Sequence, residues 1–131
     1  MPARRDSSNP RTPGSARALR ITASTVPGTA AVLRLEGKID QEERLRLENA
    51  LDSALTVGSP RLVVDLSGLE FCDSTGLNAL LRTRLDAQAA HIELLIVAPR
   101  PQTRRLLDVT GTTEIFAIRP SLRAALDGSA G

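Results

Sequence analysis

Aromatic side chains are almost missing from this chain, whose 131 residues include two Phe and neither Tyr nor Trp. Single-strand nucleic-acid platforms stack bases on aromatic rings, so the composition argues against that class of function. The chain also has only one Cys and one His, which excludes an intramolecular disulfide and any metal site built from several Cys or His ligands. We therefore expect neither a metal nor a cofactor.

Long hydrophobic runs are absent as well. No apolar stretch approaches the roughly 20 residues needed to cross a bilayer. The basic residues near the N-terminus are not followed by an apolar segment, which argues against a secretory signal. We expect a cytoplasmic protein that neither spans nor binds a membrane.

The charge is distributed unevenly along the chain. Residues 1–17 contain four Arg, one Asp and no Leu, Ile, Val or Phe, while the whole chain has a net charge of +2. The remainder is therefore close to neutral, and a basic nucleic-acid-binding face on it is not expected. A segment without large apolar residues cannot offset its ordering entropy, so residues 1–17 are predicted to be a disordered basic tail. A basic arm that contacts an acidic partner is the alternative.

Residues 18–128 are predicted to form one domain, because strand and helix patterns alternate along them. Two strands joined by a turn at Pro27 and Gly28 are followed by a loop at residues 37–40. The later elements are a helix at 41–55, a strand at 61–66, a loop at 67–72, a helix from 73, a strand at 91–98, a helix at 101–111, a strand at 114–118 and a short helix at 120–126. The order β-β-α-β-α-β-α-β-α predicts an α/β fold with a mixed, mostly parallel sheet and helices packed mainly on one face.

The first two helices are expected to bury leucine stripes. The first carries apolar residues at Leu45, Leu47, Leu51, Ala54 and Leu55, and the second carries Leu77, Leu80, Leu81 and Leu85. Spacings of three and four residues place such side chains on one helix face.

Enzyme motifs are absent: the chain contains no GxGxxG, GxxxxGK[ST] or GxSxG sequence. His91 lies at the mouth of a predicted strand and is interpreted as a surface residue. Cys72 has no cationic neighbour in the sequence and is interpreted as a buried structural residue. We therefore predict a protein that is not an enzyme and has no catalytic residues.

One constellation has functional potential: Asp73, Ser74, Thr75 and Gly76 open a helix directly after a strand and a short loop. Ser74 lies at or next to the N-cap, where a side-chain oxygen accepts a free backbone N–H. It is also a candidate phosphoacceptor, because a helix N-terminus tolerates phosphate and Gly76 would allow close backbone approach. Phosphorylation would add about −1.5 to −2 charges beside Asp73 and Asp40.

The sequence around this constellation resembles a STAS domain, in particular the free-standing anti-sigma factor antagonists of bacteria. The matching segments are residues 35–40, 64–67, 71–77, 94–97 and 105–111, and the resemblance extends over about residues 19–127. Position 38 is Lys where many members of the family carry Glu.

The resemblance implies a switch. The unphosphorylated antagonist would bind an anti-sigma factor that is also an ATP-dependent serine kinase, and so free a sigma factor. Phosphorylation of Ser74 would end that binding, and a serine phosphatase would reverse it. Asp40 and Asp73 would flank the acceptor, and Thr75, Gly76 and Leu77 would lie in the docking surface of a protein that is a monomer when free.

Two alternatives remain. The first is a STAS scaffold module of a stress-signalling or lipid-transport complex, in which Ser74 is mainly a helix-capping residue without a phospho-switch. The second is a small enzyme or a nucleic-acid binder that uses the Arg-rich tail.

Overall fold

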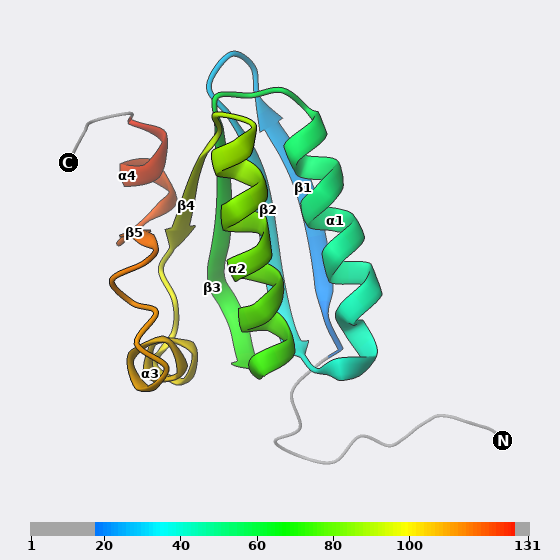
Figure 1. Cartoon of the computed structure of the whole chain (residues 1–131), viewed down its shortest axis with the longest axis vertical. Helices are drawn as coiled ribbons and strands as arrows, with labels where there is room; N and C mark the ends of the chain where they lie inside the picture. Colours follow the sequence, from blue (N-terminus) through cyan, green and yellow to red (C-terminus); the bar gives the residue numbers. More distant parts are fainter. Residues whose placement is uncertain (1–17, 128–131) are drawn as a thin grey trace, which may run out of the picture.

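The computed structural model describes residues 18–127, which form a five-stranded sheet with helices on both faces (Figure 1). The predicted tail at residues 1–17 and the predicted domain end at residue 128 lie outside the described residues. The strands are β1 (Arg20–Val26), β2 (Ala30–Ile39), β3 (Arg61–Cys72), β4 (Glu93–Val97) and β5 (Ala117–Arg119). The helices are α1 (Arg44–Thr56), α2 (Ser74–Ala89), α3 (Pro101–Val109) and α4 (Leu122–Leu126), with a 3-10 turn, η1 (Gln41–Glu43), before α1. The predicted order of elements is confirmed.

The strands are adjacent in the order β1-β2-β3-β4-β5. The β1–β2 hairpin is antiparallel and turns at Gly28, whose φ of +73° suits a residue without a Cβ. The other three pairs are parallel, because a helix crosses over between each of them. The prediction of a mixed, mostly parallel sheet is confirmed.

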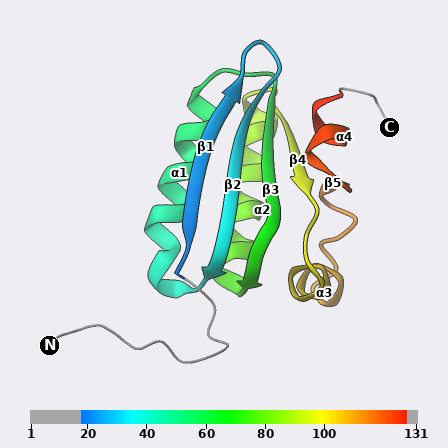
Figure 2. The same ribbon diagram turned by 180° about the vertical axis from the view of Figure 1, so that it is seen from behind.

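Helices α1 and α2 lie side by side over one face of the sheet, and the opposite face of β1 and β2 carries no helix (Figure 2). The larger core cluster lies between this helix pair and the sheet and includes Leu47, Leu51 and Leu80. The smaller cluster lies on the other face, where α4 packs through Ala125. Helices therefore pack mainly on one face, as predicted.

The predicted leucine stripes need two corrections. Leu45 and Leu85 are exposed to 62% and 61%, although the sequence pattern placed both on buried faces. The face of α2 that packs on the sheet instead follows Leu80, Thr83 and Ala87, all of which are buried. At 100° per residue, Leu85 is turned well away from Leu80.

The predicted loops at residues 37–40 and 67–72 are also wrong, because β2 extends to Ile39 and β3 extends to Cys72. The turn-forming residues of these segments lie beside two register shifts in the β2–β3 pair. At the first shift the pairing passes from Arg34 with Asp65 to Glu36 with Gly68, and the second shift follows Gly37. A β-bulge absorbs an extra residue without ending the strand. The last strand, predicted at 114–118, forms at Ala117–Arg119.

Candidate functional site

The candidate site lies at the carboxyl ends of β2 and β3, which end at the same position of the sheet. Ile39 and Cys72 are register partners at the last positions of the two strands, and the Asp73 amide donates to the Ile39 carbonyl across 3.4 Å. Asp40 directly follows β2, and Asp73 directly follows β3. The parallel pairing therefore brings the two predicted carboxylates to neighbouring strand ends, 33 positions apart in the sequence.

Asp73 is the N-cap of α2, and Ser74 is the first helical residue. The Asp73 carboxylate accepts a hydrogen bond from the Thr75 amide at 2.9 Å, which satisfies one of the free N–H groups of the helix. Ser74 is exposed at the surface, Thr75 is half-buried and Asp73 is half-buried. The structure thus places Ser74 next to the cap, where its side chain is accessible to another protein.

Asp40 repeats this capping arrangement on the neighbouring strand. Its carboxylate accepts a hydrogen bond from the Glu42 amide at 3.1 Å and caps η1. The second carboxylate oxygen lies 3.4 Å from the Lys38 ammonium. Lys38 thus partly neutralises Asp40, so this ion pair is a feature of the site that a family member with Glu at position 38 would lack.

Gly76 and Leu77 lie beneath the surface. A Cβ at position 76 would stand 2.5 Å from the Cys72 sulfur and 3.1 Å from a methyl group of Ile39. The close approach that Gly76 permits is therefore between α2 and the ends of β2 and β3. Leu77 is 5% exposed and belongs to the main core. Both residues would shape a docking surface from below, and their part in binding stays a prediction.

Gln102 is a site residue that the sequence did not reveal. It lies in the first turn of α3, and its side-chain amide forms two hydrogen bonds of 2.8 Å with the backbone N–H and C=O of Cys72. No local sequence pattern distinguishes a glutamine in the first turn of a helix as a site residue. Only the fold shows that it meets a residue 30 positions earlier in the chain.

Cys72 is buried, as predicted. Burial, together with the negative charge of Asp73, raises the pKa of the Cys72 thiol to about 12. The group is therefore protonated at neutral pH, which is the form that makes a thiol a poor nucleophile.

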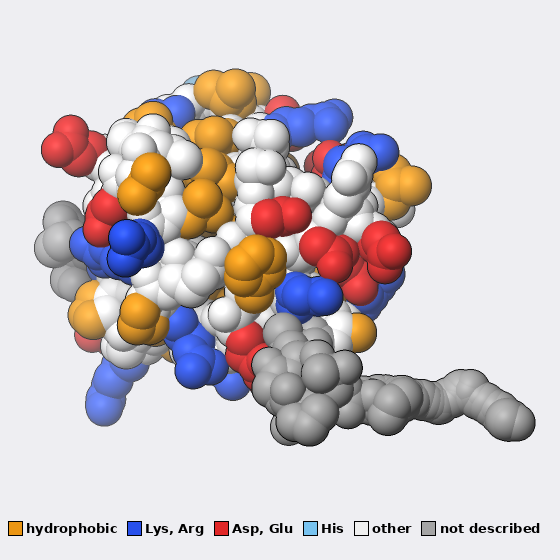
Figure 3. All heavy atoms as spheres, turned by 90° about the horizontal axis from the view of Figure 1, so that it is seen from below, with side chains coloured by type: hydrophobic (Ala, Val, Ile, Leu, Met, Phe, Trp, Pro, Cys, Tyr) orange, Lys and Arg blue, Asp and Glu red, His pale blue; other side chains and the backbone are white. Residues whose placement is uncertain are grey.

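This end of the molecule presents a mixed surface, in which acidic and basic side chains surround hydrophobic ones (Figure 3). Phe71, at the end of β3, is 39% exposed there. Among residues 18–127, no three His, Cys, Asp or Glu side chains gather closely enough to hold a metal ion. The chemistry that the site offers is an accessible hydroxyl at the positive end of a 16-residue helix, next to the Asp73 carboxylate that caps the helix.

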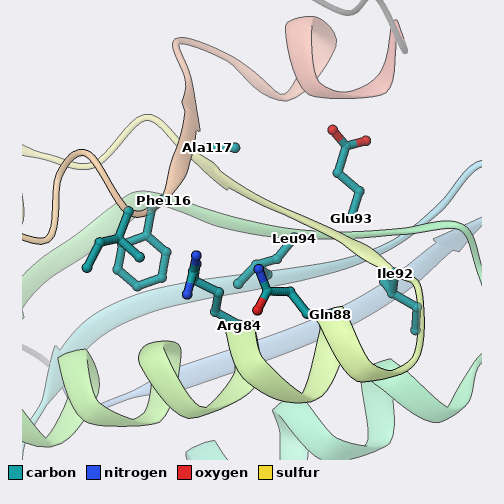
Figure 4. Close-up of a pocket in the computed structure, with 8 residues that line it drawn as sticks. Arg84, Gln88, Ile92, Glu93, Leu94, Phe116 and Ala117 are labelled. Carbon is teal, nitrogen blue, oxygen red and sulfur yellow. The ribbon is translucent and has the colours of Figure 1, made fainter.

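A separate hollow lies beside the C-terminal half of α2, toward β4 and β5 (Figure 4). Its volume is about 240 Å³, and Arg84, Gln88, Leu94 and Phe116 are among the residues that line it. None of the predicted site residues lines this hollow.

Comparison with known proteins places the fold and the sequence in one family. The model of the family described as "Mlab, STAS domain" matches residues 22–120. The anti-sigma-F factor antagonist RsfB of Mycobacterium tuberculosis is 33% identical over 101 residues, which cover 77% of this chain and 82% of that protein. The chain belongs to the STAS domain family.

Solved structures agree with this assignment. The crystal structure of an anti-sigma factor antagonist from Mycobacterium paratuberculosis superimposes with a TM-score of 0.77 at 30% identity, covering 87% of this chain and 96% of that one. The anti-sigma factor antagonist SpoIIAA in its unphosphorylated form gives a TM-score of 0.69 at 18% identity, over 80% of this chain and 92% of that one, which shows a shared fold. Within residues 18–127, none of the helices is both long and apolar enough to span a membrane.

Proposed function

We propose that this protein is an anti-sigma factor antagonist, a regulatory binding protein that is not an enzyme and whose partner is an anti-sigma factor. The proposal is supported by the relatives described as anti-sigma factor antagonists, two of which are at least 30% identical over most of this chain. It is also supported by the exposed position of Ser74 at the N-terminus of α2, where a partner protein could dock.

The finer proposal is a switch at Ser74. The unphosphorylated chain binds an anti-sigma factor that is also a serine kinase, and this binding frees the sigma factor. The kinase transfers the γ-phosphoryl group of ATP to the Ser74 hydroxyl oxygen, while ADP leaves and the hydroxyl proton is released. The observation that carries this proposal is the exposure of Ser74 at the N-terminus of α2.

The electrostatics of the site support such a switch without refolding. The positive end of the helix dipole favours an anion at Ser74, so the domain tolerates the phosphate. The added charge of about −1.5 to −2 joins the carboxylates of Asp73 and Asp40 at the same surface. A clash of about 3–4 kcal/mol with the partner would lower affinity several-hundred-fold, because each 1.4 kcal/mol is about tenfold. A serine phosphatase would then restore the binding form.

The test is incubation of the full chain with ATP and an anti-sigma factor kinase of the source organism, followed by mass-spectrometric mapping. We expect one phosphate, on Ser74, and release of the modified chain from the kinase. Modification of another serine, or continued binding by the chain phosphorylated at Ser74, would overturn the switch. An unmodified chain that stays in a larger complex would instead favour the STAS scaffold module.

A further inference from the structure

The end of β3 lacks a strand neighbour on the side of β4. The last register partner of β4 is Val97, which lies opposite Asp65, whereas β3 continues to Cys72. Cys72 is 1% exposed, so its backbone N–H and C=O cannot both rely on water. Buried backbone groups of this kind almost always have a hydrogen-bond partner in the protein.

Gln102 supplies these partners from α3. The Cys72 amide donates to the Gln102 Oε1 at 2.8 Å, and the Gln102 Nε2 donates to the Cys72 carbonyl at 2.8 Å. One side-chain amide therefore does what a residue of a neighbouring strand would do. On the other side of the same chain segment, the Asp73 amide donates to Ile39 in β2.

Buried side chains anchor the helix that carries Gln102. Pro101 begins α3, and its fixed φ suits the first helical position. Thr103 and Leu107 are each 1% exposed and fix the helix to the rest of the domain. The helix that carries the Gln102 amide is therefore held against the core on the side of Thr103 and Leu107.

We propose that Gln102 is a positioning residue for the switch: by clamping Cys72, α3 holds the Asp73–Ser74 turn in the conformation that the partner recognises. This inference rests on the proposed function of Ser74. A preformed turn binds without an ordering cost, so a loosened turn weakens both docking and phosphorylation.

Cys72 itself provides the test, because it is the only thiol of the chain and lies under the turn. The full chain is labelled with a thiol-reactive disulfide such as 4,4′-dithiodipyridine, and the rate is followed in low urea. Each intramolecular hydrogen bond contributes roughly a factor of two to ten to an opening equilibrium. We expect Gln102→Leu to label about tenfold faster than wild type, at a rate that urea does not change below the unfolding transition.

Two controls separate positioning from general stability. Gln88→Leu changes an exposed glutamine on α2 and should label like wild type. Leu95→Val weakens the core on the other face of the sheet. If this variant labels faster than wild type, its labelling rate should increase with urea concentration, because labelling then occurs through global unfolding. If Gln102→Leu labels like wild type, or only in step with global unfolding, the clamp is overturned. Should Gln102→Leu fail to fold, Gln102→Asn replaces it, because the asparagine side chain is one methylene too short to reach Cys72. We expect the same faster labelling for this variant.

The functional arm uses a kinase that phosphorylates the wild-type chain. We expect kcat/KM for Gln102→Leu to fall about tenfold and that for Leu95→Val to stay within twofold; an equal loss in both variants would overturn a positioning role. If no anti-sigma factor kinase modifies wild type, the proposed function fails, while the labelling comparison still decides whether the clamp exists.

Discussion

Gly76 in α2 lies directly against Cys72 in β3, so closely that a Cβ at position 76 would stand 2.5 Å from the Cys72 sulfur. The first turn of α2 can pack on the strand ends only because this side chain is absent. The contact ties the helix that carries Ser74 to the core, and it makes glycine a structural requirement of the site.

Gly76→Ala should therefore lower the free energy of unfolding. Alanine normally stabilises a helix interior relative to glycine by about 0.5–1 kcal/mol. Overpacking here costs about 1–3 kcal/mol, so we expect a net loss of about 1–2 kcal/mol in urea unfolding. Because Cys72→Ala removes the sulfur, the double variant should be less destabilised than the sum of the two single variants. Strict additivity would contradict the contact.

Asp73→Ala should remove the N-cap of α2. The carboxylate accepts the Thr75 amide at 2.9 Å, and loss of such a cap costs about 1 kcal/mol. Asp73→Asn keeps an acceptor oxygen and should stay within about 0.5 kcal/mol of wild type in the same urea experiment. A similar loss in both variants would show that the charge, and not the cap, stabilises the helix.

Ser74→Asp should separate binding from folding. An acidic residue in the first turn gains about 0.3–1 kcal/mol from the helix dipole, which offsets repulsion from Asp73. We expect a free energy of unfolding within about 1 kcal/mol of wild type, but a large loss of affinity for the anti-sigma factor in calorimetric titration. Ser74→Ala should bind normally and resist phosphorylation. Tight binding by Ser74→Asp would argue against a charge switch.

Cys72 should make the domain less stable in alkaline solution. Burial, and secondarily Asp73, raises the thiol pKa from its ordinary 9.0 to about 12. The unfolded chain therefore loses this proton at a lower pH than the folded chain. The contribution of the buried thiol to the free energy of unfolding is complete below pH 9 and is lost as the pH rises toward 12. In urea unfolding at a series of pH values, Cys72→Ala should show a flatter decline above pH 9 than wild type. Parallel curves would place the alkaline sensitivity in another group.

Local patterns predicted the order of elements, because apolar periodicity and helix caps act over a few residues. They also placed Ser74 at the start of a helix, because Asp73 caps the first turn of α2 through a residue only two positions away in the sequence. The partner roles of Asp40, Thr75, Gly76 and Leu77 stay predictions.

The lengths of β2 and β3 could not be read locally. Gly37 and Gly68 are typical of turns, yet both have register partners within the strands, because β3 accommodates its extra residues as bulges beside them. The same holds for Gln102, whose contact with Cys72 depends on β4 ending early. Each of these features comes from long-range pairing, which leaves no periodic signal in the sequence.

The position of α4 has a practical consequence. It lies at the end of the sheet opposite the first turn of α2, as Figures 1 and 2 show. Ala18, by contrast, lines a hollow with Gly37, Glu70 and Arg100, beside the ends of β2 and β3. Immobilising the protein on a sensor through a residue of α4 would leave the Ser74 end facing solution, whereas attachment at Ala18 would lie next to the surface under study.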